Sequence, residues 1–100
     1  MQSFYPEVFE RDMGTSEAEW VAAMPRAIGD HPWQRRPDGA FVVEIGSGQL
    51  EISWTPLPER RIALLVMKRL LVRFAFEGLD EAQRLAFMKP FDLTIQRGGG

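Results

Sequence analysis

Cysteine is absent from the 100-residue sequence. This excludes disulfides, thiolate nucleophiles and thiolate metal sites, and it fits a reducing compartment. The longest apolar run spans residues 62–67 and is far shorter than the ~20 residues of a membrane helix. The N-terminal residues 1–13 are acidic and lack the apolar stretch of a secretory signal. We therefore expect a cytoplasmic protein with no membrane partner.

Histidine is almost absent as well, and no group of residues forms a recognisable catalytic or metal-binding motif. His31 is the only histidine, no serine stands in a nucleophile context, and the carboxylates are scattered. We expect no cofactor and no metal. One alternative stays open, in which the polar loop 29–37 binds an anion as a small-ligand-binding domain or enzyme. Its candidate contacts are His31, Trp33, Arg35 and Arg36.

The charge is close to balanced but unevenly distributed. The formal net charge is −2, and 45% of the residues are hydrophobic, which is ordinary for one globular domain over residues 1–100. Residues 1–19 carry five acidic residues against Arg11 alone, whereas residues 60–73 carry five basic residues and no acidic one. Because the domain as a whole is slightly acidic, a nucleic-acid partner is not favoured.

Two segments have the signature of a helix start. Ser16 and Glu19 have the spacing of a capping box, as do Asp80 and Gln83. The first predicts a helix over residues 17–24, with a kink at Pro25 and an end near Gly29. The second predicts a helix from about residue 81. Residues 91–96 either prolong this helix past Pro90 or alternate as a final strand, and we favour the helix.

The middle of the chain alternates apolar and polar residues, as strands do. Residues 41–45 and 50–54 flank Gly46-Ser47-Gly48, which predicts a hairpin, and Pro56 and Pro58 are expected to close its second strand. Residues 61–77 fit a helix or a second hairpin. We favour a hairpin of 61–67 and 70–77 that turns at Lys68-Arg69.

These elements predict an α+β fold. The expected architecture is a two-layer sandwich, a four-stranded antiparallel meander with an N-terminal and a C-terminal helix on one face. Residues 29–39 form a loop, residues 1–14 an N-terminal arm, and residues 97–100 a flexible glycine tail.

Two helices cover only one face of such a sheet, and the second predicted hairpin is apolar on both faces. Its outer face is therefore the candidate interaction surface, edged by arginines. Alternatively, the N-terminal segment with Phe4, Tyr5 and Phe9 covers this face. We expect a non-enzymatic protein-interaction module or homodimer. The surface comprises Ala63, Leu65, Met67, Leu71, Arg73 and Ala75.

Parts of the sequence resemble two known groups of proteins. The end of the chain, Gln96 to Gly100, is similar to the diglycine tail of ubiquitin-like sulfur carriers, which would imply adenylation and thiocarboxylation of the last glycine. The segments YPEVFERDMGTSEAEW, GDHPW, PLPERRIALL and FDLTIQRGGG resemble a family of short proteobacterial proteins. The second resemblance covers most of the chain and implies a bacterial cytoplasmic origin. It implies no activity and no site residues.

Overall fold

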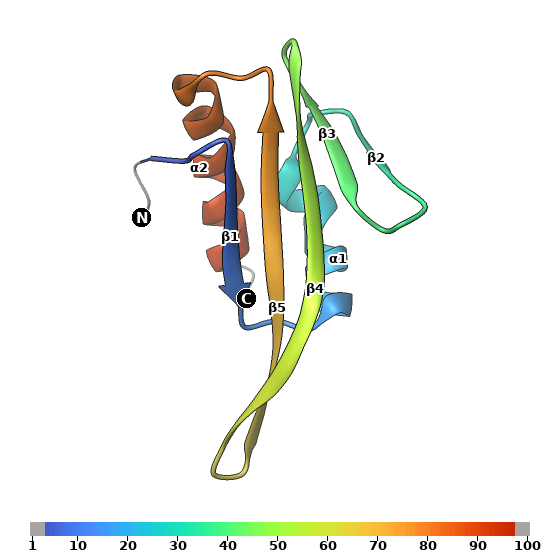
Figure 1. Cartoon of the computed structure of the whole chain (residues 1–100), viewed down its shortest axis with the longest axis vertical. Coiled ribbons are helices and arrows are strands. Elements are labelled where there is room, and N and C mark those ends of the chain that lie inside the picture. The colour runs from blue at the N-terminus through green and yellow to red at the C-terminus, as the bar shows by residue number, and fades with distance from the viewer. Residues whose placement is uncertain (1–3, 98–100) are drawn as a thin grey trace.

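The computed structural model describes residues 4–97, which form a five-stranded antiparallel sheet backed by two helices (Figure 1). The predicted α+β class is confirmed, with five strands instead of four. The strand order in the sheet is β1-β5-β4-β3-β2. Along the chain the elements are β1 (Val8–Met13), α1 (Glu17–Ile28), β2 (Trp33–Arg35), β3 (Phe41–Ile45), β4 (Gly48–Ile62), β5 (Leu65–Glu77) and α2 (Glu81–Arg97).

The two edge strands lie where the sequence predicted irregular structure. β1 occupies part of the expected N-terminal arm and pairs with β5, from Val8 opposite Ala75 to Met13 opposite Leu70. β2 lies within the expected loop 29–39 and pairs with β3. Both predictions were wrong because the local sequence signal of these strands is weak. β1 pairs with a strand that is distant in the sequence, and β2 has only three residues.

The core lies between the sheet and the two helices. On β5, alternate residues from Leu70 to Phe76 are buried, and Leu50 and Ile52 oppose them on β4. Both helices pack on this one face, as predicted, and they contact each other (Figure 1). The aromatic and aliphatic side chains that they contribute include Trp20, Met24, Phe87, Met88 and Phe91.

Both helices continue through a proline. α1 runs unbroken to Ile28, so the kink expected at Pro25 does not divide it, and the Gly29 amide donates to the Pro25 carbonyl (3.2 Å). α2 likewise contains Pro90 and runs to Arg97, which confirms a helix over residues 91–96. Buried side chains on both sides of each proline hold the helix against the sheet and offset the lost hydrogen bond. Both predicted capping interactions are present.

The β4–β5 hairpin is longer than predicted and turns elsewhere. The hairpin of β3 with the start of β4 is confirmed, but β4 then continues through Pro56 and Pro58 to Ile62. The reversal occurs at Ala63 and Leu64, and not at Lys68-Arg69. The prolines are tolerated because β3 pairs with β4 only as far as Ile52, so that one edge of β4 has no neighbour beyond it.

A buried polar network fastens β1 and the preceding residues to α2. The Arg11 guanidinium donates to both oxygens of the buried Asp92 carboxylate (2.7 and 2.9 Å), and the Tyr5 hydroxyl donates to one of them (2.5 Å). Arg84 adds a bond from its guanidinium to the Tyr5 carbonyl (2.7 Å). The network therefore ties Tyr5 and Arg11 near the start of the chain to Arg84 and Asp92 of α2.

Replacing Asp92, the acceptor at the centre of this network, tests how much the network contributes to stability. Asp92→Ala leaves Arg11 and the Tyr5 hydroxyl without their carboxylate, so we expect the free energy of unfolding to fall by about 3–5 kcal/mol. The matched control is Asp12→Ala, which removes the exposed partner of Arg69 and should cost much less. Urea unfolding of both variants provides the measurement; equal losses would contradict the assigned role of Asp92.

Tyr5 is the only tyrosine, so its ionisation can be followed without interference. Burial, and then the hydrogen bond to Asp92, raise the pKa of Tyr5 from 10.0 to about 12. Because the folded state binds this proton more tightly, its contribution to stability is complete below pH 10.0 and is lost as the pH rises toward 12. We expect tyrosinate absorbance to appear near pH 12 in the native protein and near pH 10 in urea. A native midpoint near 10 would show that the hydroxyl is not buried against Asp92.

Candidate functional site

The most prominent surface feature is a two-stranded projection, called here the finger, which comprises residues 57–69 of β4 and β5 (Figure 1). β1 ends its pairing at Leu70 and β3 ends its pairing at Ile52, so β4 and β5 continue alone beyond the sheet. The molecule is consequently elongated, with a longest extent of 47 Å. A register shift between Leu57 and Arg60 lies at the base of the finger.

The tip of the finger is apolar and open to solvent. Leu64 is 99% exposed and Leu65 is 65% exposed. Among the described residues nine large hydrophobic side chains are exposed, and five of them lie together at this tip. On an ordinary protein surface such side chains occur singly and are scattered. The five at the tip are Ile62, Leu64, Leu65, Val66 and Met67.

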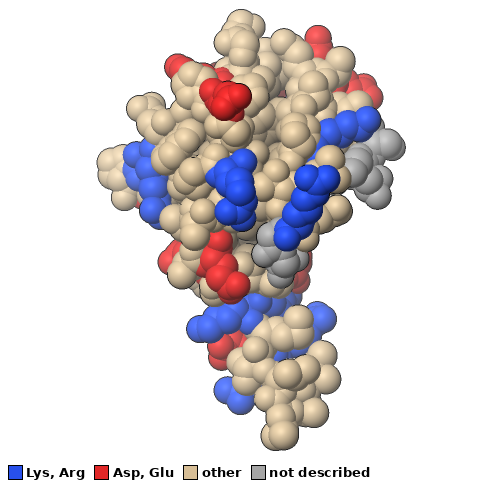
Figure 2. Space-filling model, turned by 180° about the vertical axis from the view of Figure 1, so that it is seen from behind, with Lys and Arg blue, Asp and Glu red and all other residues tan. Residues whose placement is uncertain are grey.

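Basic side chains surround the finger between its tip and the body. The collar consists of Arg60, Arg61, Lys68 and Arg69, and Figure 2 shows blue side chains between the tan tip and the body. Lys68 lies 3.6 Å from Glu59, and Arg69 is paired with Asp12. The hydrogen bonds from Arg69 hold the pKa of Asp12 below its usual value. The finger therefore carries a net positive charge, with four basic side chains and one acidic one. The rest of the sequence is net negative, with eight basic and thirteen acidic side chains.

The turn at the tip is not one that local stability would favour. Ala63 adopts a φ of 54°, in the left-handed region that asparagine and glycine occupy most readily. Neither residue occurs between positions 57 and 77. The apolar tip is thus present despite a backbone cost, and folding alone does not explain it.

A hollow of about 370 Å³ lies at the root of the finger, opposite its tip. The first turn of α1, with Ser16, Glu17 and Ala18, forms one wall. The other wall is formed by Pro56, Leu57 and Glu59 of β4 and by Lys68, Arg69 and Leu70 of β5. Most of the exposed lining is apolar, and the two carboxylates come from different walls.

The residues of the predicted interaction surface fall into two settings. Leu65 and Met67 lie on the finger, with Ala63 at its turn, while Leu71, Arg73 and Ala75 face outward on the sheet body. On the body, Leu71 and Ala75 are only partly exposed. Leu71 lies opposite Asp12 and Thr55, and Ala75 lies opposite Val8 and Glu51. The body part of the predicted surface therefore mixes apolar and charged neighbours. Apolar exposure is concentrated at the finger instead.

The N-terminal segment does not cover the outer face either. Tyr5 is buried, and the Phe9 ring stacks on the Phe74 ring at 4.8 Å between centroids. Phe74 belongs to the helix-covered face of β5, so Phe9 extends the core there. For Tyr5 and Phe9 the alternative of shielding the outer face is wrong, because β1 joins the edge of the sheet instead of crossing it.

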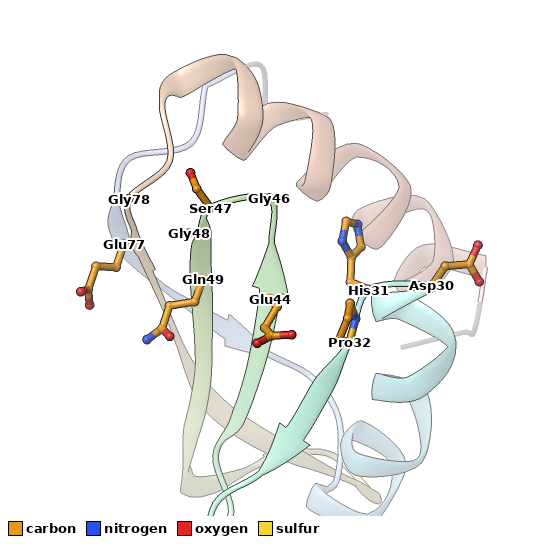
Figure 3. A pocket seen from close by; sticks show the side chains of 10 residues that line it. All are labelled: Asp30, His31, Pro32, Glu44, Gly46, Ser47, Gly48, Gln49, Glu77 and Gly78. Carbon is orange, nitrogen blue, oxygen red and sulfur yellow. The ribbon is translucent and has the colours of Figure 1, made fainter.

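The four residues of the predicted anion site do not converge. The His31 ring packs edge-on against Phe87 at 5.3 Å, beside an open hollow of about 640 Å³ (Figure 3). Asp30, Glu44 and Glu77 also line this hollow, and Asp30 points away from it in Figure 3. Such a lining does not favour an anion.

The other three members lie on or beside β2 and face different ways. Arg35 donates to the Gly39 carbonyl (3.1 Å) and lies over the Phe41 ring, and Trp33 packs against the same ring. Arg36 pairs with Glu51 of β4, on the outer face of the sheet. None of these contacts directs a guanidinium toward His31.

Other kinds of site find little support. Within residues 4–97 no group of three or more His, Cys, Asp or Glu side chains is placed to hold a metal ion. Neither described helix has the length and apolar character needed to cross a membrane. The glycine tail 98–100 lies outside the described residues, and residues 91–97 before it are helical and not a strand.

Comparison with known proteins adds no homologue. No family model matches the sequence, and no curated protein or solved structure is significantly similar to it. Function must therefore be inferred from the residues of this chain.

Paired substitutions on β5 test whether the tip serves folding. Leu65 and Leu70 lie on the same strand, but Leu70 is only 2% exposed. Leu70→Ala should lower the free energy of unfolding by about 2–5 kcal/mol, whereas Leu65→Ala should change it by less than about 0.5 kcal/mol. Urea unfolding measures both. A large loss at Leu65 would mean that the tip is part of the core.

Proposed function

We propose that this protein is a non-enzymatic interaction module that binds another protein chain through the finger. The observation that carries the proposal is the apolar tip, in which five neighbouring side chains are exposed although the sheet and helices bury a complete core elsewhere. A surface of this kind gains free energy when a partner covers it. The proposal keeps the cytoplasm as the compartment predicted from the sequence.

The tip and the collar have different roles in such a complex. Covering a leucine-sized side chain fully contributes roughly 1.5–3 kcal/mol, so two or three tip residues supply a useful affinity before the costs of association. Lys68 and Arg69 already face Glu59 and Asp12, so it is chiefly Arg60 and Arg61 that favour a partner surface with carboxylates beside an apolar pocket. Salt should therefore slow association more than it speeds dissociation.

Shortening the finger tests the proposal without touching the core. Replacing residues 58–68 by Asn-Gly joins Leu57 directly to Arg69 across a two-residue turn, and these two residues already face each other in the register. We expect an unchanged unfolding transition together with loss of the complexes that the full-length chain forms. Sedimentation of the purified protein and cross-linking in cells that express it provide the readout.

A matched pair of substitutions provides the control. Leu64→Glu places a charge on the tip, while Leu93→Glu places the same charge on another exposed leucine, on α2. Only the first should remove the complexes. If the full-length and shortened chains sediment identically and cross-link to the same proteins, the finger is not a binding element.

A further inference from the structure

We infer that the finger binds a second copy of this chain, and that each tip enters the hollow at the root of the partner's finger. The inference rests on the proposed function and names its partner. In the resulting dimer two fingers lie side by side in opposite directions. Each chain contributes one tip and one hollow.

The tip and the hollow are chemically complementary. The tip is an apolar knob around Leu64 with Arg60 and Arg61 behind it, and the hollow has apolar walls with Glu17 and Glu59. Of the other charged groups that line the hollow, Lys68 and Glu59 lie beside each other and Arg69 is paired with Asp12, so Glu17 is the carboxylate that remains for the partner. The Trp54 indole donates to one oxygen of Glu17 (2.8 Å), which leaves the other oxygen for an incoming guanidinium.

The spacing suits a closed dimer. Tip and hollow are separated by roughly six residues along each strand, or about 20 Å. Two fingers placed antiparallel therefore bring both tips to both hollows at once, with the two-fold axis near the Arg60–Met67 pair. The same surface serves both chains, so assembly stops at two.

The other large hollow of the described chain is a poorer receptor. It lies at the far end of the sheet, beside His31, and its lining is mainly polar with Glu44 and Glu77. An apolar tip buried there would exclude water from these polar groups and offer them no hydrogen bonds in return.

The size of the contact sets the expected strength. The finger has thirteen residues, and the hollow adds a few more, which is fewer than the roughly 20–30 residues per side of a standard interface. We therefore expect a reversible dimer whose population rises with protein concentration. Sedimentation equilibrium should detect it, and Leu65→Glu should shift it to monomer.

Single cysteines test the arrangement, because the chain has no thiol of its own. Leu64→Cys marks the tip and Ala18→Cys marks the hollow, and both positions are exposed. A short bifunctional maleimide should link the two variants when they are mixed and should give little dimer with either alone. A chain that carries both substitutions should give a doubly linked dimer.

Ser47→Cys is the matched control, because Ser47 is exposed at the far end of the sheet beside the other hollow. Linkage of Leu64→Cys to Ser47→Cys, or mainly to itself, would overturn the inferred contact. A strict monomer at all concentrations would also overturn it. So would a monomer that floats with vesicles of phosphatidylglycerol, which would assign the tip to an anionic lipid surface.

These outcomes separate the inference from the proposed function. The chain could prove to be a monomer whose cross-linked protein partners are lost with Leu64→Glu and kept with Leu93→Glu. That result would reject the dimer but keep the finger as a binding element. If the chain is a monomer and Leu64→Glu also leaves its cross-linked partners unchanged, both the dimer and the proposed binding function are rejected.

Discussion

The pairing of β4 with β5 is the constraint on which the rest of the structure depends. Its register places Leu50 and Ile52 opposite Phe76 and Phe74, and so defines the face that both helices cover. β1 and β3 add to the two outer edges of this pair, and the Arg11–Asp92 contact then ties β1 to α2. Because β4 and β5 are longer than any neighbour, the same pairing that builds the core also produces the finger.

Much of the architecture was predictable because its signals are local. Capping residues marked both helix starts, and glycines marked the turn between β3 and β4. The turn of the long hairpin carries no such mark, since Ala63 and Leu64 stand where asparagine or glycine is usual. Pro56 and Pro58 pointed to a strand end, yet an unpaired edge accommodates them. β1 was missed because its partner β5 lies about sixty residues away in the sequence.

The candidate site was only partly accessible to sequence reasoning. Leu65 and Met67 were recognised as exposed from the apolar character of both strand faces, but Ile62, Leu64 and Val66 were not. The available signal was an apolar run with pairs of basic residues on both sides, which indicates a finger once the turn is placed at its centre. The anion-site prediction grouped residues that are close in sequence. Arg35, the last residue of β2, and Arg36 directly after it nevertheless make contacts in different directions.

The prolines of β4 have a consequence for how the finger recognises anything. A two-stranded ribbon with open sides invites main-chain strand addition, and with it uncontrolled fibre growth. Pro56 and Pro58 remove two amide donors near the root of one side, and the register shift there interrupts the regular ladder. Lys68 and Arg69 place positive charge on the other strand. These features disfavour main-chain pairing along the ribbon. The choice of binding partner therefore depends on the shape and charge of the side chains.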